Sequence, residues 1–141
     1  MAAVRGKNTG PERRAAEALK RLGFRIQRHR KSLPGTPDIV LPQVKIVVLL
    51  NGCLWHGHKG CRRAKLPSTN RDFWRKKVEG NMRRDRRQLR ELRKVGWRPL
   101  VVWTCRKIEE SYLAGRLKRF RVTVGVNGRA SVRSAKRTRR A

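Results

Sequence analysis

Ile46-Val47-Val48-Leu49-Leu50 is a run of five apolar residues near the centre of the chain, and Asn51-Gly52 follows it directly. The short length and the β-branched residues favour a strand, because a helix would need about ten residues or more. An uninterrupted apolar run is typical of a strand that is buried on both faces. We therefore expect a central strand over 46–50 that ends at the Asn-Gly turn.

The chain before this strand predicts a helix, a turn and a second strand. Residues 11–23 begin with proline, end with glycine and carry one apolar stripe, formed by Ala15, Ala18, Leu19 and Leu22. Residues 24–27 continue as a short strand or loop. The turn residues 33–37 then place Asp38 at the head of an apolar strand over 39–41.

The chain after the central strand predicts a long helix, a strand and a final helix. Residues 73–92 form a basic helix with scattered apolar positions, residues 97–103 a second apolar strand, and residues 108–120 the last helix. The order predicts one α/β domain over 11–122, with a central mixed sheet flanked by helices. Residues 1–10 are expected to be a basic N-terminal arm. Residues 123–141 are expected to be a basic tail that is disordered when free.

The charge of the chain indicates a polyanionic partner. Thirty-nine Lys and Arg stand against nine Asp and Glu, for a formal net charge of +30. Nucleic acid is the partner that this charge favours, although membrane surfaces, acidic proteins and a purely structural role of the ribosomal-protein type remain open. No apolar run approaches the roughly 20 residues that span a bilayer, and residues 1–7 lack the apolar core of a secretory signal. We therefore expect a cytoplasmic protein.

Cysteine and histidine are concentrated in one loop. Residues 53–61 hold two cysteines and two histidines. Thiolate and imidazole are the ligands that zinc prefers, and four of them close a structural site. Cys53, His58 and Cys61 supply three, and Cys105 supplies the fourth if the strand before it lies beside this loop. The alternative is a pair of buried thiols beside a surface histidine.

The few acidic residues are candidates for metal binding. Asp38 follows a proline at the head of a strand, and phosphodiester cleavage needs carboxylates that hold magnesium. His56 is not needed for a four-ligand zinc site and is suited to activating water. Asp38 can equally be turn chemistry, and Glu12 and Asp85 can be ordinary partners of neighbouring arginines. The residues alone do not say which bond is cut.

Several motifs in collinear order resemble the very-short-patch repair (Vsr) endonuclease family, and the likeness covers nearly everything from Arg5 to Cys105. The matching segments are Leu33-Pro34-Gly35-Thr36-Pro37-Asp38-Ile39-Val40, Asn51-Gly52-Cys53-Leu54-Trp55-His56-Gly57-His58, Lys65-Leu66-Pro67-Ser68-Thr69-Asn70-Arg71-Asp72-Phe73-Trp74, Asn81-Met82-Arg83-Arg84-Asp85 and Gly96-Trp97-Arg98-Pro99-Leu100-Val101-Val102-Trp103-Thr104-Cys105. The resemblance implies a restriction-endonuclease-like fold. It also implies a bacterial-type, nucleoid-associated enzyme that nicks duplex DNA 5′ of the mispaired thymine in a T·G pair, which arises when 5-methylcytosine deaminates.

The resemblance also implies roles for individual residues. Asp38 matches the principal magnesium ligand, and Leu50 would add its backbone carbonyl. His56 matches the general base, Asp85 the carboxylate that supports it, and Glu12 the acidic residue of the first helix. The structural zinc ligands match Cys53, His58, Cys61 and Cys105.

Aromatic wedges and basic residues complete the DNA contacts that the resemblance implies. Trp55 and Trp74 match side chains that the family drives into the base stack, where an already weakened step costs less to open. Leu54 stands where many relatives carry phenylalanine, and Asn51 replaces a common histidine or aspartate. The motif that contains Arg83 and Arg84 is assigned to DNA binding.

Two alternatives remain beside the mismatch nuclease. One is a related site-specific or homing-type endonuclease, and the other is a non-catalytic, zinc-stapled DNA-binding protein. A single nick at a single mispair needs only a monomer, so we expect a monomer. Recruitment by another repair protein is left open.

Overall fold

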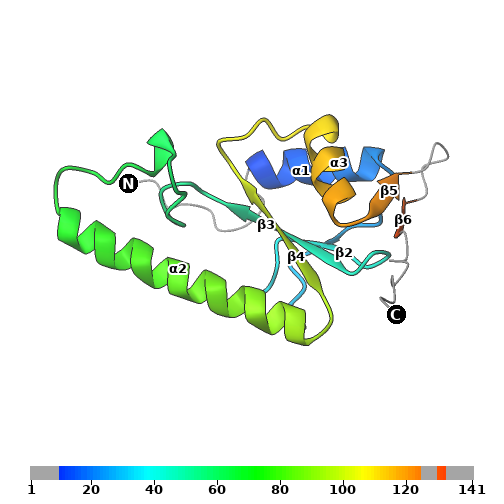
Figure 1. The fold of residues 1–141 in the computed structure, drawn as a ribbon, viewed down its shortest axis with the longest axis horizontal. Coiled ribbons are helices and arrows are strands. Elements are labelled where there is room, and N and C mark those ends of the chain that lie inside the picture. The colour runs from blue at the N-terminus through cyan, green and yellow to red at the C-terminus, as the bar shows by residue number, and fades with distance from the viewer. Residues whose placement is uncertain (1–9, 125–129, 133–141) are drawn as a thin grey trace, which may run out of the picture.

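A four-stranded sheet forms the centre of the computed structural model, which describes residues 10–124 and 130–132 (Figure 1). The strands are β1 (Gln27–Arg28), β2 (Ile39–Leu41), β3 (Ile46–Asn51) and β4 (Arg98–Trp103), in the order β1-β2-β3-β4. β1 and β2 pair antiparallel, as do β2 and β3, whereas β3 and β4 pair parallel. The expected central mixed sheet is therefore confirmed.

The parallel pair β3–β4 determines where the loops of the molecule meet. Its register runs from Ile46 opposite Arg98 to Asn51 opposite Trp103. Parallel neighbours need a crossover connection, and the helix α2 (Arg71–Lys94) provides it. Because both strands end at the same edge of the sheet, the loop that begins with Cys53 and the loop that contains Cys105 emerge side by side.

Helices cover both faces of the sheet. The helices α1 (Gly10–Arg21) and α3 (Glu110–Arg119) lie on one side and α2 on the other (Figure 1). In β3, Ile46 and Val48 join the core with α1 and α3, whereas Val47 and Leu49 pack in a second cluster with Leu92 of α2. This alternation follows from the two-residue period of a strand and explains why the run at 46–50 is apolar throughout.

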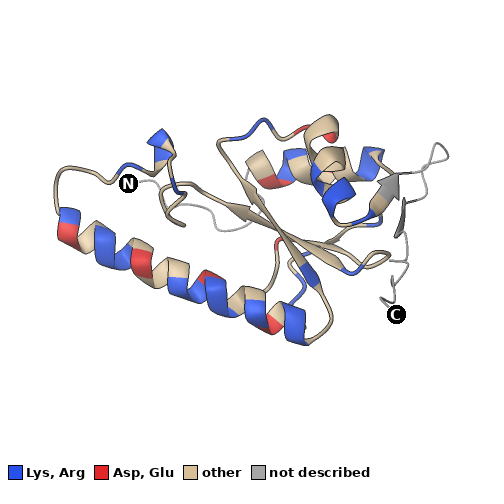
Figure 2. Ribbon diagram, viewed as in Figure 1, with Lys and Arg blue, Asp and Glu red and all other residues tan. Residues whose placement is uncertain are grey.

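The helix α2 is much more exposed than its apolar residues suggested. Of its 24 residues only Val78 and Leu92 are buried, and Phe73 is 58% exposed. Its N-terminal half continues past the sheet and runs beside the loop that follows β3 (Figure 1). Basic residues occur along its whole length (Figure 2), so α2 presents an extended cationic surface.

Three short segments complete the described structure. The expected short strand or loop at 24–27 ends in the two-residue strand β1, and a 3₁₀ turn, η1 (Arg62–Ala64), lies in the loop after β3. The strands β5 (Val122–Val124) and β6 (Ala130–Val132) pair antiparallel, and β6 lies within the segment 123–141 that was expected to be a basic tail. The β-branched residues of β5 favour this pairing. The rest of the expected arm and tail, residues 1–9, 125–129 and 133–141, lies outside the described residues.

Within the described part of the chain, no helix is both long enough and apolar enough to cross a membrane.

Candidate active site and metal centre

One cleft contains all five residues that were assigned to catalysis or to magnesium. It has a volume of about 600 Å³. Its lining includes Glu12 from α1, Asp38 from the turn before β2, Leu50 from β3, His56 from the loop after β3, and Asp85 from α2. Residues that lie up to 73 positions apart in the sequence therefore meet at the end of the sheet where β3 and β4 terminate.

Asp38 is a half-buried carboxylate held by the backbone of β3. The amide of Leu50 donates a hydrogen bond to its Oδ2 at 3.1 Å. Burial raises the pKa of Asp38 above its ordinary value; the nearby Glu12 adds to the rise, and the Leu50 amide, His29 and His56 oppose it. Ionised Asp38 is thus poorly compensated by its protein neighbours, and a bound cation would stabilise it.

The backbone of Leu50 suits the carbonyl role that the resemblance implies. In a strand, the N–H and C=O of one residue point to the same neighbour. The Leu50 N–H is directed at Asp38, whereas the Asn51 carbonyl accepts from Thr104 on the β4 side at 3.1 Å. β2 pairs with β3 only as far as Val48. The Leu50 carbonyl, like the Leu50 N–H, therefore points to the side of β3 along which β2 no longer pairs.

Glu12 lies in a second cluster of potential ligands that includes a residue the sequence analysis missed. Its carboxylate is buried at 4% exposure. Arg28 Nη2 lies 3.2 Å and His29 Nε2 3.5 Å from Glu12 Oε2. Potential ligand atoms of Glu12, His29 and Asp38 all lie within 4.8 Å of one another. The signal for His29 was scarcity, since the chain has three histidines and His29 is the one outside the Cys/His loop.

His56 and Asp85 form a close pair across the cleft. His56 Nδ1 lies 2.6 Å from Asp85 Oδ2, and both side chains are about one-quarter exposed. A carboxylate at Nδ1 favours the tautomer that carries its proton there. The Nε2 atom of neutral His56 then retains a lone pair and can accept a proton.

Two contacts with α2 position the loop that carries His56. Asn81 donates from Nδ2 to the Trp55 carbonyl at 2.9 Å. Gly57 has a φ of +61°, and a Cβ there would lie 2.6 Å from the sulfur of Met82 and 3.0 Å from Val78. Glycine therefore provides both the left-handed backbone and the space for close approach to the helix.

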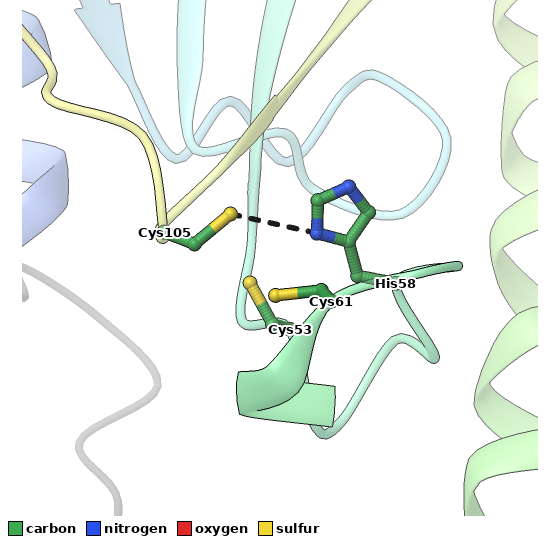
Figure 3. A group of neighbouring side chains, drawn as sticks. All are labelled: Cys53, His58, Cys61 and Cys105. Carbon is green, nitrogen blue, oxygen red and sulfur yellow. Dashed lines mark hydrogen bonds between the residues drawn. The ribbon is translucent and has the colours of Figure 1, made fainter. Parts of the chain in front are cut away.

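The four proposed zinc ligands form one cluster at the ends of β3 and β4 (Figure 3). Cys53, His58 and Cys61 come from the loop after β3 and Cys105 from the turn after β4, and their ligand atoms lie within 4.8 Å of one another. Cys105 Sγ is 3.5 Å from His58 Nδ1, and the imidazole stacks on Trp103 at 4.1 Å between centroids. Ligand atoms about 2.0–2.3 Å from a central zinc ion would lie at similar separations.

The thiols of this cluster interact strongly. At Cys61 burial acts to raise the pKa, but hydrogen bonds from the backbone of Arg63 and from the other two thiols outweigh it and lower the pKa. At Cys105 burial and then the neighbouring Cys53 and Cys61 raise the pKa. Thiolate, the form that binds metal, would be stabilised here by a bound cation, which fits a metal-binding set.

An aromatic cluster lies where the loop after β3 meets the beginning of α2. The rings of Trp55 and Trp74 are 5.4 Å apart and those of Phe73 and Trp74 5.5 Å apart, both edge to face. Lys77 Nζ lies 5.5 Å from the Trp55 ring. Leu54 is half-buried, and Arg83 and Arg84 are exposed further along α2. Phe73 was expected to be an apolar position of the helix, but it extends this aromatic surface into solvent.

The fold and the cleft together define a class. A mixed sheet, carboxylates and a His–Asp pair at the end of a parallel strand pair, and a long cationic helix beside them are the architecture of a nuclease. The family model described as "DNA mismatch endonuclease Vsr" matches residues 1–63.

Curated relatives cover most of the chain. A type II nicking enzyme of Xanthomonas oryzae, V.XorIIP, is 46% identical over 84% of this chain and 86% of its own. The DNA mismatch endonuclease Vsr of Escherichia coli is 36% identical over 85% of this chain and 80% of its own. The type II nicking enzyme V.NmeAIP of Neisseria meningitidis is 38% identical over 85% of this chain and 85% of its own. The chain belongs to the Vsr DNA mismatch endonuclease family. It is accordingly a DNA endonuclease, with an α/β fold that fits the restriction-endonuclease-like type.

Proposed function

We propose that this enzyme nicks duplex DNA 5′ of the mispaired thymine in a T·G pair and uses magnesium to do so. The observation that carries the proposal is the single cleft in which Glu12, Asp38 and the His56–Asp85 pair meet beside Trp55. The relative from Escherichia coli is named a mismatch endonuclease, which supports the choice of substrate.

Asp38 and the backbone carbonyl of Leu50 are the proposed magnesium ligands. Both are oxygen donors, which Mg²⁺ prefers, and burial raises the pKa of Asp38, so a bound cation would stabilise its ionised form. The ion would supply stabilisation of the negative charge that grows on the phosphate. Glu12 adds a second carboxylate at the same end of the cleft.

His56 is the proposed base that takes the proton from the attacking water. Asp85, 2.6 Å from Nδ1, keeps that nitrogen protonated and leaves Nε2 as the acceptor. It also stabilises the imidazolium that forms when Nε2 takes the proton. Asp85 is therefore a positioning residue, and His56 is the residue that touches water.

The cluster of Cys53, His58, Cys61 and Cys105 is the proposed structural zinc site. It joins the loop that carries Trp55 and His56 to the end of β4. A closed four-ligand site has no open position for chemistry. Zinc would therefore fix the catalytic loop rather than take part in cleavage.

The aromatic cluster and α2 are the proposed DNA-binding surface. Trp55 and Trp74, together with Leu54 next to Trp55 in the chain, are the proposed wedges into the base stack, and Arg83 and Arg84 are the proposed phosphate contacts. Insertion of a side chain requires less free energy at a base step that is already weakened, so a mispair is opened in preference to a paired step.

Incision of a duplex with one T·G mispair, beside its T·A twin, tests the proposal. We expect a single magnesium-dependent nick in the T·G duplex and none in the twin. Equal cutting of both duplexes would support the site-specific alternative. Tight binding without incision in any divalent metal would support the non-catalytic alternative.

A further inference from the structure

Glu12 and Asp38, which line the active-site cleft, lie close to His29, so that two carboxylates and one imidazole come together. Potential ligand atoms of the three lie within 4.8 Å of one another. They come from α1, from the residue after β1, and from the turn before β2. Oxygen and imidazole nitrogen donors at such separations can surround one divalent ion.

We propose that His29 is a protein ligand of the divalent ion that Asp38 holds, so that the site binds through oxygen and nitrogen and has a higher affinity for Mn²⁺ than for Mg²⁺. The inference rests on the proposed function, because it concerns the metal that Asp38 holds there. It goes beyond it in adding a nitrogen ligand and a choice of ion.

The backbone around His29 supports a dedicated position for this side chain. His29 has a φ of +51°, in the left-handed region that non-glycine residues rarely occupy. Its amide donates to the Asp38 carbonyl at 3.2 Å, which continues the β1–β2 ladder by one residue. Strained backbone persists where the surrounding structure holds it, commonly at functional sites. Here it accompanies an imidazole whose Nε2 lies 3.5 Å from Glu12 Oε2.

The donor set determines the expected ion. Mg²⁺ binds through oxygen and gives up its waters reluctantly, whereas imidazole suits transition-metal ions. Mn²⁺ binds carboxylate oxygen, as Mg²⁺ does. It also accepts imidazole nitrogen, as the other transition-metal ions do. Glu12 and Asp38 alone offer carboxylate oxygen, which suits Mg²⁺ and Mn²⁺ alike, so His29 is the residue that would shift the preference towards Mn²⁺.

An ion-pair cluster without metal is the competing explanation. Arg28 Nη2 lies 3.2 Å from Glu12 Oε2, and a protonated His29 would make a second pair with the same carboxylate. In that arrangement His29 would help to hold α1 against β1, and its removal would not change the affinity for a metal ion.

A Mn²⁺ titration distinguishes the metal site from the ion-pair cluster. Mn²⁺ is added to the zinc-loaded full chain, and the free Mn²⁺ is followed by electron paramagnetic resonance. His29→Gly is the main variant because glycine adopts the left-handed backbone without strain. Lys45→Gly is its matched control, since exposed Lys45 has a φ of +52° in the turn between β2 and β3. Circular dichroism establishes that each variant is folded.

We expect His29→Gly to weaken Mn²⁺ binding by about tenfold or more, and Lys45→Gly to change it by less than about twofold. Mg²⁺ binding, measured by competition, should weaken less than Mn²⁺ binding. His29→Asp, which offers oxygen in place of nitrogen, should restore binding with a preference moved towards Mg²⁺. Unchanged Mn²⁺ affinity in folded His29→Gly, or equal losses for both ions, would overturn the proposal.

These outcomes are separate from those of the incision assay. An enzyme that nicks T·G duplexes while His29→Gly binds Mn²⁺ normally rejects the His29 ligand and keeps the proposed function. If His29→Gly weakens Mn²⁺ binding but the enzyme cuts the T·A duplex as fast as the T·G duplex, the His29 ligand is kept and the proposed function is rejected.

Discussion

At the scale of single residues, the side chains that line the cleft could be singled out from the sequence where a motif marked them. Asp38 follows a proline at the head of a strand, and His56 lies in the Cys/His loop, so both could be singled out. For His29 the only signal was the scarcity of histidine, because nothing near it in sequence indicates that β1 carries it to Glu12 and Asp38. Such proximity depends on strand pairing, which a single sequence does not display.

Replacing Asp38 with Asn tests the metal site and the burial of its charge together. We expect nicking to fall by about 1000-fold, since a lost metal ligand removes several kcal/mol of transition-state stabilisation. The Leu50 amide keeps an acceptor, because the asparagine carbonyl can replace Oδ2. Nicking at near-normal rates by this variant would reject Asp38 as the metal ligand.

The same variant should be more stable than the parent without magnesium. The pKa of Asp38 is raised mainly by burial, so its ionised form is disfavoured in the folded state. The contribution of Asp38 to stability is fully present below its pKa in the unfolded chain, where the side chain is protonated. That contribution is lost as the pH rises through the raised pKa of the folded chain. Thermal unfolding in magnesium-free buffer should show a higher Tm for Asp38→Asn at pH 7.5 and no such gain at pH 3.

Asp85→Asn tests the positioning of His56. The amide cannot hold the Nδ1 proton as a carboxylate does, so we expect kcat to fall by about 100-fold or more while KM changes little. Glu79→Gln, an exposed acid on the same helix, is the matched control. The nitrogen chemical shifts of His56 should report a changed tautomer in Asp85→Asn alone. An unchanged tautomer with reduced activity would contradict the positioning role.

At the scale of elements, the three helices and the main strands followed from periodicity and turn residues, with ends that differ by a few positions. The contacts between these elements could not be predicted from periodicity or turn residues. The close approach of Gly57 to Met82 and the hydrogen bond from Asn81 to the Trp55 carbonyl hold the loop that carries His56 on α2. These contacts depend on how the loop lies across the helix. The exposure of Phe73 was missed for a related reason, since α2 extends beyond the sheet that its apolar residues were expected to cover.

Gly57→Ala measures the close approach of this loop to α2. A Cβ at Gly57 meets the Met82 sulfur at 2.6 Å, whereas a Cβ at Gly60, with a similar φ of +69°, meets nothing within 4 Å. Both variants incur a left-handed backbone cost of about 1–2 kcal/mol, and only Gly57→Ala adds overpacking of about 1–3 kcal/mol. Urea unfolding of the two variants gives the difference. Equal losses of stability would show that the contact is unimportant.

Removal of one zinc ligand tests the junction between the loop after β3 and the end of β4. We expect one zinc ion per chain by mass spectrometry under native conditions, and its loss in Cys105→Ala. Because structural zinc contributes directly to folding, Tm should fall by more than about 10 °C. A Cys105→Ala chain that keeps its zinc and its Tm would contradict the four-ligand site.

At the scale of the whole molecule, the net charge of +30 correctly indicated a nucleic-acid partner, because the chain is a member of a DNA endonuclease family. The sequence indicated a basic helix over 73–92 but not where that helix lies relative to the cleft. The structure places eleven Lys and Arg on the 24-residue helix α2, which borders the cleft. The fold class was predictable from element order. The sheet order and the meeting of both candidate metal sites at the ends of β3 and β4 required the three-dimensional structure.

The salt dependence of DNA binding locates the electrostatic surface. Each phosphate contact contributes about 0.9 to the slope of log affinity against log salt. We expect the double variant Arg83→Ala/Arg84→Ala to reduce that slope by about 2. Lys118→Ala/Arg119→Ala removes the same charge from exposed positions on α3, across the sheet from α2, and should change it much less. Equal effects would show that net charge, and not α2, governs binding.

The most direct test of the mismatch-nicking function is the single-turnover incision rate of an end-labelled T·G duplex relative to its T·A twin, with the cut position mapped on each strand. We expect one magnesium-dependent cut, on the strand with the mispaired thymine and on its 5′ side, at least about 100-fold faster than any cut in the twin. Cuts at equal rates in both duplexes, or on the strand with guanine, would contradict the proposed function.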